Sequence, residues 1–137
     1  SGAGLQRMFS VVVGLEQMRS QGGVLIVEEP ESHLHPRLQR DLARHVVEVL
    51  VSNPGASTLI ETHSEVFLLA ALEAAVERLA GEVRLLWVEP LDGGASAPAP
   101  IALDATGRPR TPTLERAFDT MGVMRRDLLE LRRPRGG

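Results

Sequence analysis

The chain has 137 residues, a formal net charge of −3 and 43% apolar residues, which is the size and composition of an ordinary globular domain. Its fifteen basic side chains are all Arg, and Cys and Tyr are absent, so the sequence excludes a lysine nucleophile, thiol catalysis, cysteine-ligated zinc and a P-loop lysine. No export signal opens it, and its apolar runs are far shorter than the ~20 residues that cross a bilayer, so we expect a cytoplasmic protein without membrane contact.

The first predicted elements are a helix, a strand and a second helix. Apolar residues at spacings of three and four predict a helix from Gly4 to about Arg19, with Leu5, Met8, Val12 and Leu15 on its buried stripe. The run Val24–Val27 is short, apolar and rich in β-branched residues, as in a buried parallel strand. A helix then begins at Pro36 and ends before Asn53. We expect one face of this helix to hold Leu38, Leu42, Val46, Val49 and Leu50.

The same cycle repeats in the next segment. Residues 57–60 form a second strand candidate, and Thr62 followed by Glu65 has the spacing of a capping box for a helix that ends at Gly81. Residues 83–88 form a third strand candidate. Alternating strands and helices with short, right-handed connections predict an α/β fold with a parallel sheet of about three strands and flanking helices.

The segment after Glu89 is rich in Pro and Gly and predicts a small C-terminal extension. Residues 93–100 read as a loop, and residues 101–103 as a short strand in a hairpin-like appendage. Short helices are expected near 113–120 and 124–132, followed by a basic tail. The expected domains are therefore 1–89 and 90–137.

Acids and His follow the predicted strands. Ligands of parallel α/β sheets bind beyond the carboxyl ends of the strands. Glu28 and Glu29 follow the first strand, Glu61 and His63 the second, and Glu89 the third. Of two adjacent carboxylates, one can hold Mg²⁺ while the other orients a water that attacks a γ-phosphate, and a neighbouring His can contact that phosphate.

These segments resemble a known family of ATPases. Residues 24–36, Val-Leu-Ile-Val-Glu-Glu-Pro-Glu-Ser-His-Leu-His-Pro, are similar to the Walker B strand and D-loop of ABC-type ATPase heads, in the version found in overcoming-lysogenization-defect-like and structural-maintenance-of-chromosomes-like bacterial AAA ATPases. Residues 61–65 resemble the H-loop of these proteins, and residues 1–4 resemble their signature segment. The resemblance extends from Ser1 to about Glu89.

The resemblance implies a role for each matching residue. Glu28 would hold Mg²⁺, Glu29 would be the catalytic carboxylate, and His63 would be the switch His at the γ-phosphate. The D-loop residues, which would pack across a homodimer of heads, are Ser32, His33, Leu34 and His35. The signature residues, which would bind the nucleotide of the partner head, are Ser1, Gly2 and Gly4. Arg7 lies in the first turns of the helix after the signature segment. Two interpretations are open, contact with a phosphate and improved solubility of the surface, and we favour the second.

The missing P-loop determines which part of such a head the chain resembles. The resemblance implies the C-terminal half of an ATP- and Mg²⁺-dependent ATPase, inactive alone, whose partner is the N-terminal P-loop half of the same head. Nucleotide-driven dimerisation would be coupled to a DNA repair or phage-defence effector, and nucleic acid is a further candidate partner. Two alternatives stay open: a self-contained metal-dependent hydrolase that uses His33, His35 and His63 with Glu28 or Glu31, and a non-enzymatic interaction module.

Overall fold

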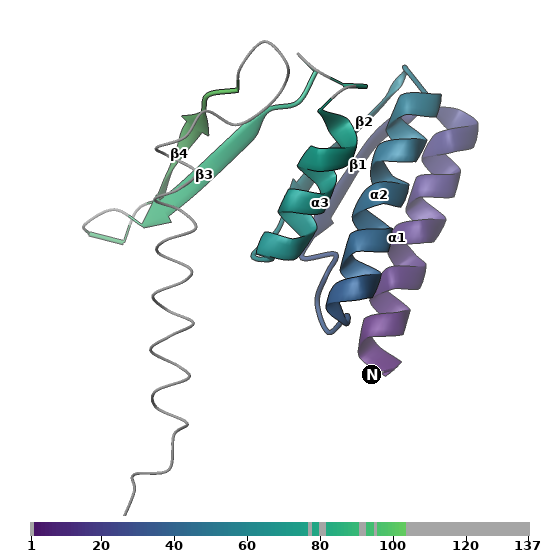
Figure 1. The fold of residues 1–137 in the computed structure, drawn as a ribbon, viewed down its shortest axis with the longest axis horizontal. Helices are drawn as coiled ribbons and strands as arrows, with labels where there is room; N and C mark the ends of the chain where they lie inside the picture. Colours follow the sequence, from purple (N-terminus) through teal and green to yellow (C-terminus); the bar gives the residue numbers. More distant parts are fainter. Residues whose placement is uncertain (1, 77, 80–81, 91–92, 95, 104–137) are drawn as a thin grey trace, which may run out of the picture. The chain divides into compact units, whose positions relative to one another are not determined.

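A computed structural model of the chain (Figure 1) describes residues 2–76, 78–79, 82–90, 93–94 and 96–103. The chain divides into two compact units, Ser1–Ala80 and Gly81–Gly137. The helices expected near 113–120 and 124–132 and the basic tail lie outside the described residues. Within the described part, every helix is too short or too polar to pass through a membrane.

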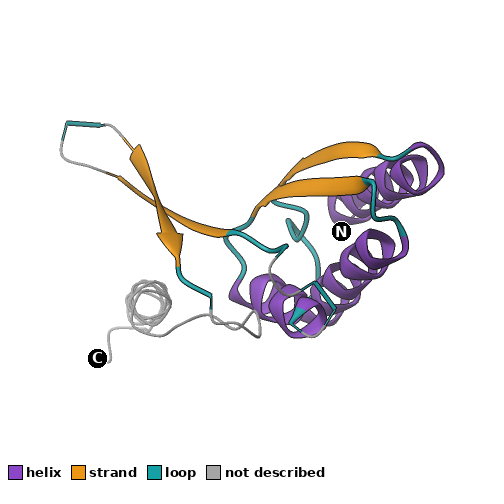
Figure 2. Cartoon of the chain, turned by 90° about the horizontal axis from the view of Figure 1, so that it is seen from above, coloured by secondary structure: helices purple, strands orange, loops and turns teal. Residues whose placement is uncertain are grey.

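The first unit is a β-α-β unit with two further helices. Its elements are α1 (Gly2–Gln21), β1 (Gly23–Glu28), α2 (Pro36–Ser52), β2 (Ala56–Glu61) and α3 (Glu65–Ala75). The strands β1 and β2 are parallel and pair in register from Gly23 opposite Ala56 to Glu28 opposite Glu61. All three helices lie on one side of this small sheet (Figure 2). The structure thus confirms the α/β prediction and its parallel pairing.

The core lies between that face of the sheet and the helices. Alternate residues of a strand point to opposite faces, so Leu25 and Val27 of β1 pack against the helical core. The buried core residues are Val11, Leu15, Met18, Leu34, Leu42, Ala43, Val46, Val49, Phe67 and Ala70. The stripe predicted for α1 was wrong at Leu5, which is exposed, whereas Leu15 is buried and Met8 and Val12 are partly buried and pack against the core. The fully buried residues of α1 are Gly4, Val11, Leu15 and Met18. The predicted residues and the buried ones both have helical spacing, so periodicity alone could not show that Leu5 lies outside the core.

The helix ends follow capping rules, with one correction. The Nδ1 atom of His35 accepts a hydrogen bond from the backbone N–H of Arg37 and caps α2, and Pro36 occupies its first turn as predicted. The cap of α3 is Ser64, whose hydroxyl accepts a hydrogen bond from the backbone N–H of Phe67. The predicted cap, Thr62, is wrong, because its hydroxyl instead accepts from the N–H of Ser64 and shapes the preceding turn. The helix ends at Ala75, before Gly81.

The opposite face of the parallel sheet is apolar and exposed. Val24 and Ile26 of β1 and Leu59 of β2 are 71%, 68% and 60% exposed. Parallel sheets are normally covered on both faces. This face is therefore an unusual surface for a chain that folds and acts alone.

The second unit contains a β-hairpin. Strands β3 (Leu85–Pro90) and β4 (Ser96–Ile101) pair antiparallel, with Trp87 opposite Ala99. The third strand predicted for the parallel sheet is therefore a hairpin strand, and the described parallel sheet has two strands. The expected loop at 93–100 is mostly strand, since β4 includes Pro98 and Pro100. Gly93 and Gly94 have positive φ angles of 91° and 83°, a conformation that suits glycine in a tight turn.

Candidate functional site

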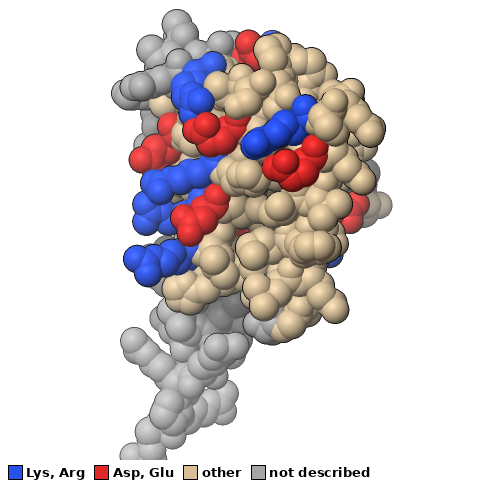
Figure 3. Space-filling view, turned by 90° about the vertical axis from the view of Figure 1, so that its right-hand side faces the viewer, with Lys and Arg blue, Asp and Glu red and all other residues tan. Residues whose placement is uncertain are grey.

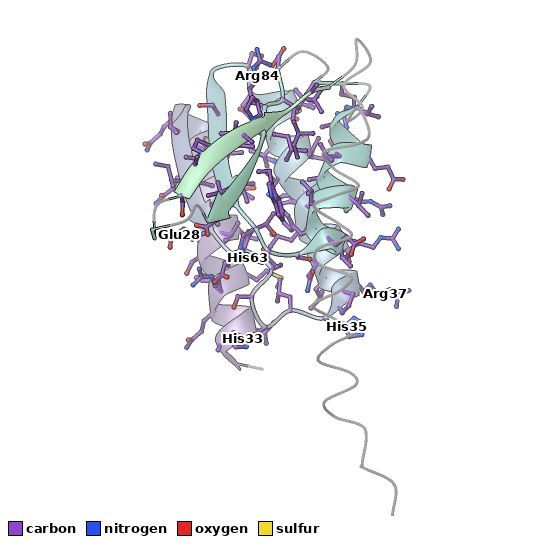
Figure 4. All side chains as sticks on the ribbon, turned by 90° about the vertical axis from the view of Figure 1, so that its left-hand side faces the viewer. Glu28, His33, His35, Arg37, His63 and Arg84 are labelled. Carbon is purple, nitrogen blue, oxygen red and sulfur yellow. The ribbon has the colours of Figure 1, made fainter. Side chains whose placement is uncertain are left out.

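The loops that follow β1 and β2 meet at the carboxyl end of the parallel sheet. Glu28 lies opposite Glu61 in the last pair of the ladder. The pairing continues one residue further, because the N–H of Glu29 donates to the carbonyl oxygen of Glu61 at 2.8 Å. The structure thus brings together the two loops in which the sequence placed acids and His, and Figure 4 shows Glu28 and His63 at this end of the sheet.

His63 stands between two carboxylates. Its Nε2 atom lies 3.4 Å from Oε1 of Glu29 and 3.4 Å from Oε1 of Glu61. All three side chains are solvent-accessible, so the group can meet a ligand from outside the unit. Glu61 had no assigned role in the sequence analysis. It was only placed among the acids near the strand ends, and its position opposite Glu28 is the signal that could have assigned it to the group around His63.

The backbone of Glu29 has an uncommon conformation. Its φ angle is +47°, in the left-handed region, which for a residue other than Gly costs on the order of 1–3 kcal/mol and is often found at functional sites. The carbonyl oxygen of Glu29 accepts hydrogen bonds from the N–H of Ser32 at 3.0 Å and from Nε of Arg7 at 3.1 Å. Nη2 of Arg7 also donates to the carbonyl oxygen of Glu28. Arg7 is exposed, as a solubilising surface residue would be, but its hydrogen bonds to these two carbonyl oxygens were not predicted from the sequence.

Glu31 connects the two loops from the inside. Its side chain is 7% exposed, and its Oε1 atom accepts a hydrogen bond from the backbone N–H of His63 at 3.0 Å. Its other carboxylate oxygen is buried and has no hydrogen-bond partner among the described residues. Buried polar atoms without a partner are rare, so this carboxylate has a specific task. Its visible task is to hold the loop that carries His63.

The D-loop residues differ in what they can offer to a partner molecule. Leu34 is buried in the core, and the side chain of His35 faces the N-terminus of α2 as its cap. His33 is exposed and has a φ angle of +62°, while Ser32 is half-buried. A contact across a dimer would therefore use Ser32 and His33 rather than Leu34.

The signature glycines have different environments. Gly2 is exposed, with nothing within 4 Å of the position that a Cβ atom would take. Gly4 is buried, and a Cβ atom there would lie 2.6 Å from the carbonyl oxygen of His33. Gly4 therefore allows α1 to approach the D-loop closely, and its role at a partner's nucleotide stays a prediction. Ser1 lies outside the described residues.

The site fits Mg²⁺ shared with a phosphate better than a metal held by protein alone. Among the described residues, no three His, Asp or Glu side chains are grouped as a metal centre would require, so His33, His35 and His63 do not form the metal site of the hydrolase alternative. Glu28 supplies an exposed carboxylate at the carboxyl end of β1. Mg²⁺ prefers oxygen ligands and often binds one or two carboxylates together with substrate phosphates.

The charged side chains on the α1 side do not form the cluster of positive charge that is typical of a nucleic-acid interface. Figure 3, which views the molecule from the α1 side, shows Arg and acidic side chains intermixed. Glu16, for example, lies 3.7 Å from Nε of Arg19 and 4.0 Å from Nε2 of His45. Nucleic-acid interfaces usually present clustered positive charge. The view therefore supports a mixed, solvated face.

Comparisons with known proteins place this geometry in a family. A family model described as "AAA domain, putative AbiEii toxin, Type IV TA system" matches residues 2–70. The matched range contains α1, β1, α2 and β2, and with them the loops that carry Glu29 and His63. The searches of curated proteins and of solved structures found no match.

Proposed function

Because the chain belongs to this AAA domain family, we propose that it is the C-terminal part of an ABC-type ATPase head that binds and hydrolyses ATP. The observation that carries the proposal is the 3.4 Å approach of His63 Nε2 to Glu29 Oε1, from two loops that lie 34 positions apart in the sequence. A carboxylate beside an imidazole, both exposed at the carboxyl end of a parallel sheet, is suited to orient water and to contact a phosphate.

In the proposed mechanism, each residue of the group has its own task. Mg²⁺ bound to ATP would neutralise charge that develops on the phosphates, and Glu28 would hold it. Glu29 accepts a hydrogen bond from the attacking water and orients it. The imidazole of His63, which lies beside Glu29 and Glu61, would donate its Nε2 proton to a terminal phosphate oxygen when ATP is bound. The left-handed backbone of Glu29 turns its side chain out of the alternation of β1 and toward His63.

The proposed partner is the N-terminal half of the same head, which would carry the P-loop. The sequence contains no Lys, so the lysine that contacts the β- and γ-phosphates must come from elsewhere. The exposed Val24, Ile26 and Leu59 support this partner, because it would cover the second face of the sheet. Both strands also have an unpaired edge within the described residues, where further strands can be added.

We further propose that the complete head dimerises on binding nucleotide and drives an effector of DNA repair or phage defence, as in overcoming-lysogenization-defect-like ATPases. The exposed positions of Gly2 and His33 at the N-terminus of α1 and in the D-loop support this dimer. Helix N-termini favour anions, so the start of α1 is suited to a phosphate of the partner head.

Complementation tests the ATPase. The chain is mixed with its P-loop half, and phosphate release is measured for the wild type and for Glu29→Gln. We expect Mg²⁺-dependent hydrolysis by the mixture and by neither half on its own. Glu29→Gln should lower the rate of phosphate release by about 10²–10⁴-fold. Glu73→Gln, an exposed carboxylate on α3, is the matched control and should leave the rate unchanged. The proposal fails if the mixture is inactive or if Glu29→Gln behaves like Glu73→Gln.

A further inference from the structure

We propose that Arg7 is a positioning residue that holds the catalytic turn at Glu28 and Glu29 in its active conformation. The proposal rests on the proposed ATPase function and adds to it a residue outside the carboxylate and His group. It follows from three observations: the two hydrogen bonds of the guanidinium, the φ angle of Glu29, and the position of Arg7 on a separate element, α1.

The guanidinium contacts two successive carbonyl oxygens. Nη2 donates to the carbonyl oxygen of Glu28, and Nε donates to that of Glu29 at 3.1 Å. Successive carbonyls of an extended strand point to opposite edges, so one planar guanidinium cannot bind both there. The left-handed φ of Glu29 turns the chain and allows both oxygens to face Arg7. The bidentate contact therefore favours the turned conformation over a continued strand.

Arg7 contacts the turn from a different element than the other backbone contacts do. The N–H of Glu29 is bound to Glu61 in β2, and the N–H of Ser32 donates to the carbonyl oxygen of Glu29 from within the loop. Arg7 comes from α1, 21 and 22 positions away in the sequence. It is the contact that links α1 to the residue whose carboxylate lies beside His63.

A role in core packing does not account for Arg7. Its side chain is exposed and borders an open hollow of about 520 Å³ between α1 and β1, whose walls include Ser10, Ile26 and Glu28. The hydrogen bonds from the guanidinium go only to backbone oxygens in the described residues, and these belong to Glu28 and Glu29. Removal of the guanidinium should therefore change the geometry of the turn more than the stability of the fold.

The test compares Arg7→Gln and Arg7→Lys with Arg19→Gln, which removes an exposed Arg of the same helix whose ion pair is with Glu16. Steady-state hydrolysis by the head reconstituted with its P-loop half gives kcat and KM for ATP. We expect Arg7→Gln to lower kcat by about 10–100-fold, as loss of residues that orient catalytic groups commonly does, with KM within about twofold. Arg7→Lys should recover part of kcat, because an ammonium can still donate to the carbonyls, and Arg19→Gln should change neither constant.

A second measurement separates this inference from the proposed ATPase. Amide hydrogen exchange of the 137-residue chain, followed by NMR, should be faster at Glu29 and Ser32 in Arg7→Gln than in the wild type and Arg19→Gln, whether or not the head hydrolyses ATP. If the wild-type head is inactive but exchange responds as expected, the proposed function fails and the positioning of the turn stands. Unchanged exchange, a raised KM with unchanged kcat, or a fall in kcat that Arg7→Lys does not recover would each overturn the role of Arg7.

Discussion

The carboxylate of Glu31 accepts a hydrogen bond from the backbone N–H of His63 at 3.0 Å and so joins the loop after β1 to the loop after β2. Glu31→Ala should lower the free energy of unfolding by about 1–3 kcal/mol, because it removes the acceptor of a partly buried N–H. Glu31→Gln keeps an acceptor oxygen and removes a buried charge, so its stability should stay within about 1 kcal/mol of the wild type. Urea denaturation measures both variants. Equal stabilities for the two would contradict this role.

Gly4 and Gly2 should respond in opposite directions to the same substitution. Gly4→Ala places a Cβ atom 2.6 Å from the carbonyl oxygen of His33, a backbone atom that can yield only if α1 and the D-loop separate, so it should cost about 1–3 kcal/mol. Gly2→Ala meets nothing and should be neutral or stabilise α1 by up to about 1 kcal/mol. Thermal unfolding of the two variants side by side tests this. A Gly4→Ala variant as stable as Gly2→Ala would show that the close contact between α1 and the D-loop is not required for stability.

Ser64, not Thr62, should carry the capping energy of α3. Loss of the Ser64 hydroxyl removes the acceptor for the N–H of Phe67 and a hydrogen bond to Gln39, and caps of this kind contribute about 1 kcal/mol. Ser64→Ala should therefore lower the midpoint of urea unfolding more than Thr62→Ala. Ser20→Ala, which removes an exposed hydroxyl bound to the carbonyl of Gln17, serves as control and should have little effect. A larger effect of Thr62→Ala would restore the capping box predicted from the sequence.

The pair of Glu48 and Arg78 should give stability a weak dependence on acid pH. The hydrogen bond from Arg78 lowers the pKa of Glu48 below its ordinary value of 4.5, with the charge of Arg78 and that of His45 as smaller causes in the same direction. Because the folded pKa is lower than the unfolded one, the stabilisation is present above about pH 4.5 and is lost as the pH falls through the folded value.

The side chains of Arg78 and Glu48 are 43% and 56% exposed, so solvent and salt should keep this effect small. Urea midpoints measured from pH 7 down to pH 3 should fall less steeply for Glu48→Gln than for the wild type. Glu73→Gln should follow the wild-type curve. If Glu48→Gln also follows that curve, the pair does not contribute to stability in solution.

The exposed face of the parallel sheet should matter for association and little for folding. Replacing Val24, Ile26 and Leu59 together with Thr places a β-branched residue at each of these exposed positions, so the free energy of unfolding should change by less than about 1 kcal/mol. Binding of the P-loop half, measured by calorimetry, should be lost. Val27→Thr, on the inner face of the same strand, should show the reverse pattern, with lower stability and retained binding. Full binding by the triple variant would mean that the partner contacts another surface.

The sequence predicted those parts of the fold that depend on local patterns. The β-α-β unit, the start of α2 at Pro36 and the acids at the ends of the first two strands follow from periodicity, capping and strand alternation, and the structure confirms them. Glu89 was predicted to follow a third strand, but it lies within β3. The third predicted strand pairs in a hairpin with the next segment of the chain, Pro98 to Ile101, and not with the parallel sheet. An apolar run does not itself specify which strand it pairs with. The alternation of Pro and small residues in β4 gave no strand signal.

The sequence predicted the residue types of the site, but it did not predict the roles that depend on backbone conformation and burial. Glu29 and His63 follow strands, so the topology alone brings them near each other. The roles of Arg7 and Glu31 depend on a left-handed φ angle and on the burial of one carboxylate, and neither is visible in a sequence. Arg7 lies on an exposed part of a helix, where most Arg side chains are solvated. Its two backbone acceptors become available only after the chain has turned at Glu29.

The prolines of β4 have a consequence for self-assembly. Pro98 and Pro100 are two positions apart, so their backbone nitrogens face the same edge of the strand, which is the edge away from β3. Proline has no backbone N–H. That edge has lost donors that a further strand needs, and it is a poor template for amyloid-like stacking. Neither β1 nor β2 contains a proline. Aggregation of the chain should therefore begin at the parallel sheet. Peptides with the sequence of β1 or β2 should seed aggregation, and a peptide with the sequence of β4 should not.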